Sequence, residues 1–181
     1  MKNIRNRFLI LFYISFYLFS NQNVINWDSM TSLINPTSII KHSNNDIVVA
    51  TSGGLLVLNE NNLEILKNNL NNLDLSILGV DKKGLIWLGG SYPNGNIQVL
   101  DNNYNLIYDS SYLEIESILD FYFSETSFFV VYNNQNDIGV LEFNYSNDIP
   151  HYIDYYNNFP EQVSTISDID LFDNHIYITT D

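Results

Sequence analysis

The chain has 181 residues, no cysteine, and 21 acidic against 7 basic side chains, which gives a formal net charge of -14 at pH 7. The lack of cysteine excludes disulfides, thiolate metal sites and lipid attachment through a cysteine. Because three of the basic residues lie close to the N-terminus, too few remain to neutralise phosphates, and we expect no nucleic-acid partner.

The first residues predict an N-terminal targeting segment. Basic residues are followed by an apolar run, Phe8 to Phe19, and a helix of that length would span roughly 18 Å, short of the ~30 Å hydrocarbon core of a membrane. This pattern is typical of a secretory signal peptide, here a signal helix in 1–21 followed by a mature domain in 22–181. A cleavage site that ends at Ser20 would favour a smaller residue than Leu18 two positions earlier. The alternative is therefore an uncleaved membrane anchor, which is the single way in which we expect the protein to contact a membrane.

The remainder repeats one layout, in which a short apolar strand, a turn, a strongly apolar strand, a second turn and another strand follow each other. Equivalent turn residues recur after 38, 43 and 47 positions, at Asp46, Gly84, Ser127 and Asn174. This spacing is close to the ~40–50 residues of a four-stranded β-propeller blade. We therefore predict an all-β fold, a partial β-propeller of about three and a half four-stranded blades, with units near 37–66, 75–113, 118–156 and 166–181.

The strongest apolar segments have the composition and length of β-strands. Ile47–Ala50 and Phe128–Tyr132 are apolar at successive positions instead of alternating. An open antiparallel sheet exposes one face to solvent, so apolar and polar residues alternate along its strands. A blade is packed on both faces by neighbouring blades, so its strands lose this alternation. A β-sandwich would show alternation and a turn every ~8–12 residues. No stretch after residue 24 has the apolar spacing of a helix over three turns.

The turn residues support these strands. Ser52-Gly53-Gly54 and Lys83-Gly84 supply glycine where a tight hairpin demands a positive φ. The segment Ser91–Asn96, with the sequence SYPNGN, predicts a longer hairpin loop. The third unit has no double glycine and turns at Asn133–Asp137.

The segment Asp81–Gly90, DKKGLIWLGG, resembles the repeat of two-component-regulator-type propellers. Blades of that family carry an aspartate, a glycine turn, an aliphatic-Trp pair and a turn of small residues. The resemblance implies a structural repeat signature without a catalytic role, at Asp81, Gly84, Trp87, Gly89 and Gly90 in the second unit and at Thr51, Gly53 and Gly54 in the first.

The start of the domain, Trp27–Asn59, is similar to the opening of the N-terminal propeller in a surface component of the type IX secretion system. Trp27, Thr31-Ser32 and Ala50–Leu55 carry this likeness. Blade motifs are specific for a fold and weak for a function, so the functions they imply rest on analogy.

The resemblance implies a secreted, periplasmic or cell-surface protein without enzymatic activity, which acts as a protein-binding or scaffolding module at the cell envelope with a link to type IX secretion. The first alternative is a ligand-sensing extracytoplasmic domain of a hybrid two-component sensor. The second is a carbohydrate-active propeller enzyme, which predicts carboxylates that converge on a central funnel. Because the fourth unit stops just before its hairpin turn, we also expect a fragment of a longer reading frame.

No residue pattern predicts a catalytic, cofactor or metal site. His42, His151 and His175 lack the spacing of zinc ligands. Asp168 and Asp170 would point to one side of a strand, but no glycine turn or closing glutamate completes a calcium loop.

Three further kinds of side chain have competing interpretations. Trp87 suits a ligand platform, but its apolar strand favours packing between blades. Glu114 and Glu116 are paired carboxylates that need a pocket for acid/base chemistry, and we interpret them as solvated rim residues. Tyrosines near the end of the third unit, such as Tyr152 and Tyr155, either fill wedges between blades or line a groove for a peptide or glycan.

Overall fold

The computed structural model describes residues 35–42, 44–59, 62–66, 69–124, 127–135, 137–159, 163–173 and 175–180. All of them belong to the unit Thr31–Asp181, one of the two units into which the chain divides. The predicted signal segment 1–21 and the residues Trp27, Thr31, Ser32 and Asn174 lie outside the described residues.

The described residues form strands, turns and loops and contain no helix, which confirms the all-β prediction. Across these ranges, accordingly, no helix is long and apolar enough to cross a membrane.

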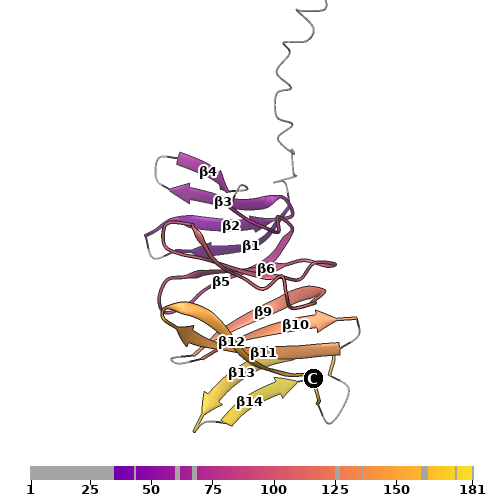
Figure 1. Ribbon diagram of the computed structural model, residues 1–181. Coiled ribbons are helices and arrows are strands. Elements are labelled where there is room, and N and C mark those ends of the chain that lie inside the picture. Colours follow the sequence, from indigo (N-terminus) through magenta and orange to yellow (C-terminus); the bar gives the residue numbers. More distant parts are fainter. Residues whose placement is uncertain are drawn as a thin grey trace, which may run out of the picture. The chain divides into compact units, whose positions relative to one another are not determined.

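Three four-stranded antiparallel sheets follow one another, each with its strands hydrogen-bonded in sequence order. Sheet 1 consists of β1 (Pro36–Lys41), β2 (Ile47–Thr51), β3 (Gly54–Asn59) and β4 (Asn62–Leu66). Sheet 2 consists of β5 (Leu75–Val80), β6 (Ile86–Gly90), β7 (Ile97–Leu100) and β8 (Leu106–Asp109). Sheet 3 consists of β9 (Ser117–Phe123), β10 (Phe128–Asn134), β11 (Asp137–Ser146) and β12 (Ile149–Tyr156), and a hairpin of β13 (Ile166–Phe172) and β14 (His175–Thr180) comes next (Figure 1).

Sheets 1 and 2 pack through an aliphatic core. Its buried strand residues are Val48, Ala50, Leu55 and Val57 from sheet 1 and Leu75, Leu78, Ile86, Leu88 and Leu100 from sheet 2. The opposite face of sheet 1 is also apolar but exposed, with Ile39, Ile47, Leu58, Leu63 and Ile65 each more than a third accessible. Sheet 1 therefore has apolar residues on both faces, of which sheet 2 covers one.

Sheets 2 and 3 pack through an aromatic core around Trp87. The fully buried Trp87 ring lies edge-on to Phe128, with centroids 4.4 Å apart, and to Phe143, with centroids 5.8 Å apart. Edge-to-face contacts of this kind add to the free energy gained by burying the rings. Trp87 is thus an interface residue between two sheets.

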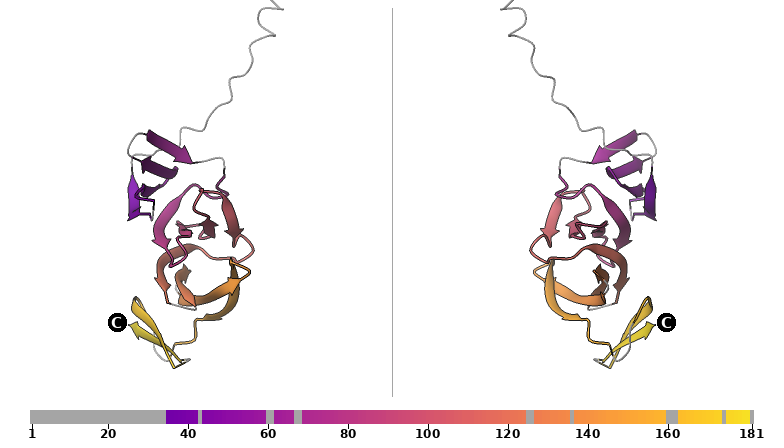
Figure 2. Two further views of the ribbon diagram at one scale, coloured as in Figure 1. Left: turned by 90° about the vertical axis from the view of Figure 1, so that its left-hand side faces the viewer. Right: turned by 90° about the vertical axis from the view of Figure 1, so that its right-hand side faces the viewer.

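Packing on both faces explains the continuous apolar strands. All five residues of β6 are buried, and Ile86 and Leu88 pack toward sheet 1 while Trp87 packs toward sheet 3. In β10, Phe128 belongs to the core shared with sheet 2, and Phe129 packs with Ile169 of the β13–β14 hairpin. The sheets follow each other in sequence order in both side views (Figure 2).

Candidate binding pocket and the aspartate turn

An open pocket of about 660 Å³ lies where connections of sheets 2 and 3 meet. Its lining comes from the β4–β5 connection, the β6–β7 loop, the β8–β9 connection and the β10–β11 turn. Strand direction alternates in these sheets, so connections that follow even-numbered strands gather at one end of the strands. Half of the lining residues carry side-chain amides, namely Asn71, Asn72, Asn94, Asn96, Asn134 and Gln135.

A buried amide on β7 holds the first wall of the pocket. The Gln98 side chain is fully buried within an otherwise apolar strand. Its Oε1 accepts hydrogen bonds from the backbone N–H groups of Asn71 at 2.6 Å and Asn72 at 3.2 Å, and its Nε2 donates to the Asn72 carbonyl at 2.9 Å. A buried amide needs such hydrogen-bond partners. Through them Gln98 holds the β4–β5 connection, which is not part of a β-strand, in place.

Asn72 joins this wall to the β6–β7 loop. Its Nδ2 donates to the Asn94 carbonyl at 2.7 Å and to Asn96 Oδ1 at 2.9 Å, while its Oδ1 accepts from the Asp74 N–H at 3.0 Å. A Cβ atom at Gly90 would lie 2.6 Å from that Nδ2. Gly90 therefore leaves the space that the Asn72 side chain occupies.

The wall on the side of sheet 3 is tied together in the same manner. Glu116 Oε2 accepts from the backbone N–H of Gln135 at 2.7 Å, and Asn134 Nδ2 donates to the Glu114 carbonyl at 3.3 Å. From sheet 2, the Gly95 N–H donates to the Ile115 carbonyl at 3.0 Å. These bonds connect three loops that come from two different sheets.

The pocket lining is polar and acidic. Besides the amides it contains the carboxylates of Glu114 and Glu116 and the hydroxyl of Ser111, with Pro93, Leu113 and Ile115 as its apolar part. No lysine, arginine or histidine is among the lining residues. Such a lining offers both donors and acceptors of hydrogen bonds and favours positive over negative charge.

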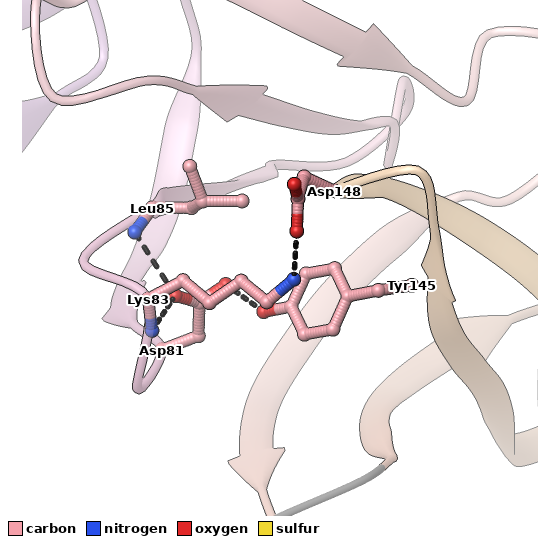
Figure 3. A network of polar contacts seen from close by, with 5 residues as sticks. All are labelled: Asp81, Lys83, Leu85, Tyr145 and Asp148. Carbon is pink, nitrogen blue, oxygen red and sulfur yellow. Dashed lines mark hydrogen bonds and ion pairs between the residues drawn. The ribbon is translucent and has the colours of Figure 1, made fainter.

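Asp81 lies at the other end of β6 and organises a turn there. Its Oδ1 accepts from the backbone N–H groups of Lys83 and Leu85, both at 2.9 Å, which closes the turn between β5 and β6. Its Oδ2 accepts from Trp87 Nε1 at 2.9 Å. The same oxygen accepts from the Tyr145 hydroxyl on β11 (Figure 3). One buried carboxylate thus joins a turn of sheet 2 to a strand of sheet 3.

Lys83 covers this contact from the solvent side. Its Nζ lies 3.8 Å from the centroid of the Tyr145 ring and 2.5 Å from Asp148 Oδ1 (Figure 3). Burial and the hydrogen bond to Asp81 raise the pKa of the Tyr145 hydroxyl, so it stays protonated and remains a donor. The arrangement is a structural clasp between two sheets, because the Asp81 carboxylate on sheet 2 accepts from Tyr145 on sheet 3 and Lys83 pairs with Asp148.

The remaining signature residues form turns and close contacts. In the β2–β3 hairpin, Thr51 Oγ1 donates to the Gly54 carbonyl at 2.8 Å and accepts from the Gly53 N–H at 3.1 Å, while Gly54 has a φ of 128°. Gly84 has a φ of 81° in the Asp81 turn. A Cβ at Gly89 would lie 2.7 Å from Ile118 Cγ2, so glycine permits the close approach of sheet 3.

The other side chains singled out by the sequence lie apart from the pocket. His42 is buried, and its Nε2 donates to the Gly84 carbonyl at 2.8 Å. Asp168 Oδ1 accepts from the Ile169 N–H at 2.9 Å. Among the described residues, no three histidine, aspartate or glutamate side chains gather as a possible set of metal ligands.

The tyrosines predicted as wedge fillers or groove residues lie outside the pocket lining. The Tyr152 ring packs edge-on against Phe143, with centroids 5.8 Å apart. The Tyr156 hydroxyl donates to Glu142 at 2.6 Å, and this bond together with burial raises its pKa to about 12. Tyr152 and Tyr156 pack against cores between sheets, which fits the wedge interpretation for these two, whereas Tyr155 is exposed.

Sequence reasoning missed most of the pocket. It interpreted Glu114 and Glu116 as solvated rim residues without predicting a pocket; Glu114 is exposed, both line the pocket, and Glu116 accepts a backbone hydrogen bond. The segments Ser91–Asn96 and Asn133–Asp137 were predicted only as a loop and a turn. A usable signal was present, because Gln98 is a polar residue inside a short apolar strand and required a buried partner.

No protein-family model and no curated protein matches the chain. Thirteen chains of solved structures are similar to it, including the two that follow. The first is the extracellular domain of BT3049 from B. thetaiotaomicron, assigned to the hybrid two-component systems, with 17% identity and a TM-score of 0.59 over 83% of this chain. The second is virginiamycin B lyase from Staphylococcus aureus, with 14% identity and a TM-score of 0.52 over 80% of this chain.

The chain is an all-β, propeller-like protein. At such low identities the two likenesses bear on the fold alone, and they support the propeller part of the predicted resemblance. The matched region is 20% of the first structure's chain and 48% of the second's, so this chain spans less than half of either.

Proposed function

We propose that the protein is an extracytoplasmic recognition module without enzymatic activity, which binds a segment of a protein partner in the pocket between sheets 2 and 3. The observation that carries this proposal is the open pocket of about 660 Å³, whose walls are connected by hydrogen bonds between loops of two sheets. Walls held in this way are formed before a ligand arrives, which lowers the entropic cost of binding.

The lining supports binding more than catalysis. Its hydroxyl group belongs to Ser111, and none of the described histidines is among the lining residues. A serine nucleophile needs a general base within hydrogen-bond reach, and acid/base work by Glu116 would compete with its bond to the Gln135 N–H.

The extracytoplasmic part of the proposal rests on the N-terminal sequence pattern and on the similarity to an extracellular domain. A link to type IX secretion rests on the resemblance of the sequence alone. Of the residues that carry it, Ala50–Leu55 form the end of β2, a hairpin turn and the start of β3.

A second candidate is a ligand-sensing domain, because one similar structure is the extracellular domain of a hybrid two-component system. The two candidates differ in what enters the pocket. A scaffold would bind a peptide segment, whereas a sensor would bind a small molecule.

Selection of random peptides displayed on phage, with the purified full chain as bait, tests the proposal. Ser111→Trp places an indole in the pocket, and Ser146→Trp is the matched control at an exposed position on β11, outside the lining. We expect peptides that bind the unchanged chain and Ser146→Trp but lose binding to Ser111→Trp. Peptides that bind all three proteins equally would contradict the proposal, and small-molecule binding that only Ser111→Trp abolishes would favour the sensor.

A further inference from the structure

We propose, on the basis of the recognition function above, that the partner segment inserts a lysine or arginine side chain into the pocket. The charge of the lining favours a cation. Two of the lining residues are glutamates and none is cationic. A carboxylate of the partner would meet like charge there, whereas an ammonium or guanidinium group would be attracted.

The pocket also retains side-chain oxygens that can accept hydrogen bonds from a ligand. Within the described part of the chain, the Glu114 carboxylate accepts no hydrogen bond, since its one contact is made through its backbone carbonyl. Glu116 uses Oε2 for the Gln135 N–H, which holds that carboxylate in place. A neutral ligand that excluded water would leave the Glu114 charge desolvated without a partner, which is costly.

The apolar residues of the lining lie beside the glutamates. Pro93 belongs to the β6–β7 loop, and Leu113 and Ile115 alternate in sequence with the two glutamates on the β8–β9 connection. Lysine and arginine bury an aliphatic stem against apolar surface while their charged end stays with polar groups. The lining combines both requirements on one short segment.

The inference is tested by NMR titration of the isotope-labelled full chain with four peptides of the form acetyl-Gly-Gly-Xaa-Gly-Gly-amide, where Xaa is Lys, Arg, Gln or Glu. We expect the Lys and Arg peptides to shift the amide signals of residues 111–116 and 134–135 and to bind about tenfold more tightly than the Gln peptide, since a charged hydrogen bond is worth about that factor. The Glu peptide should not shift these signals.

Two variants that change the net charge equally distinguish binding in the pocket from a general attraction to the acidic chain. Glu114→Gln should weaken binding of the Lys peptide about tenfold and leave the Gln peptide unaffected. Glu64→Gln, at an exposed position on β4, should change neither. Equal weakening by both variants would mean attraction to the net charge and would overturn the inference.

The remaining outcomes separate this inference from the proposed function. If the Gln peptide shifts the pocket signals as strongly as the Lys peptide, the pocket is a recognition site but not one for a cation. If no peptide shifts them at millimolar concentration, the inference is also overturned, while the phage selection still decides whether the pocket binds a partner. Failure of Ser111→Trp to affect that selection removes the proposed function itself.

Discussion

Sheet 2 contains the same aspartate turn twice, and the two copies have different surroundings. Asp81 and Asp101 each accept, at one carboxylate oxygen, the backbone N–H groups two and four positions later, at 2.8–2.9 Å. Both turns place the third following residue, Gly84 or Tyr104, at positive φ. The second oxygen differs, since that of Asp81 accepts from Trp87 and Tyr145 and that of Asp101 accepts from Asn105.

The difference teaches that one local motif can be a solvated turn or a clasp between sheets. The residue Asp81 is 7% accessible, and the Asp101 turn is more open. The loss of a buried hydrogen bond costs more free energy, because no water molecule can reach the remaining donor and accept its hydrogen bond. Substitutions at the two positions should therefore have unequal effects, although the turns look alike.

The largest effect is expected for Asp81→Ala. The change leaves the Trp87 indole N–H and the Leu85 backbone N–H buried without acceptors. At about 1–3 kcal/mol for each such donor, we expect a loss of about 2–5 kcal/mol in the free energy of unfolding. Urea titration of the full chain, followed by tryptophan fluorescence, measures it. Asp101→Ala is the matched control with an expected loss of about 1 kcal/mol, and equal losses at both positions would refute the proposed distinction.

Asp81→Asn sharpens the comparison by changing one carboxylate oxygen into an amide. The remaining oxygen can still close the turn, but the new NH₂ group would face the donors of Trp87 and Tyr145. We expect a loss of about 2–3 kcal/mol, which lies below or near that of the alanine variant because the turn survives. Asp101→Asn should lose less than about 1 kcal/mol in the same titration. If both asparagine variants match the unchanged chain, the second oxygen of Asp81 has no role in stability.

Tyr145→Phe removes one donor from the clasp and keeps the ring. The phenylalanine ring can still pack against Phe128, where the centroids lie 4.9 Å apart, and beneath Lys83. Because Asp81 retains three donors, we expect a loss of only about 1 kcal/mol. A double-mutant cycle with Asp81→Asn measures the coupling between the two residues, and a coupling of zero would show that the contact contributes nothing.

The sequence predicted the strands and turns well because their signals are local. Glycine at Gly84, the double glycine after Ser52 and the loop at Ser91–Asn96 each mark a turn between apolar runs, and the structure has turns or loops there. The continuous apolar run in β6 also indicated packing on both faces. In these cases the pattern of a few neighbouring residues determines the backbone or its burial.

The pocket and the clasp could not be predicted in the same way, because they depend on pairs of residues far apart in the chain. Tyr145 is 64 residues from Asp81, and the Gln98 amide meets a connection 26 or 27 residues earlier. The segment Asp101–Asn105 has Tyr104 where the other turn has Gly84, but this difference does not show which of the two aspartates meets a facing strand. The tertiary contact with a facing strand, and not the local turn motif, determines which of the two aspartate turns joins two sheets.

The smallest effect is expected from the acidity of Asp101. Burial opposes ionisation of this carboxyl, but its hydrogen bonds with Asn105 and Asn103 outweigh that, so its pKa lies below the ordinary value of 3.8. A carboxyl whose pKa is lower in the folded than in the unfolded chain contributes stability above the unfolded pKa and loses it as the pH falls through the folded one. We expect the difference in unfolding free energy between the unchanged chain and Asp101→Asn to be at most about 1 kcal/mol at neutral pH. It should shrink as the pH falls below about 4, the ordinary pKa of an aspartate. Urea titrations of both proteins at several pH values check this, and a difference that grows on acidification would contradict the assigned direction.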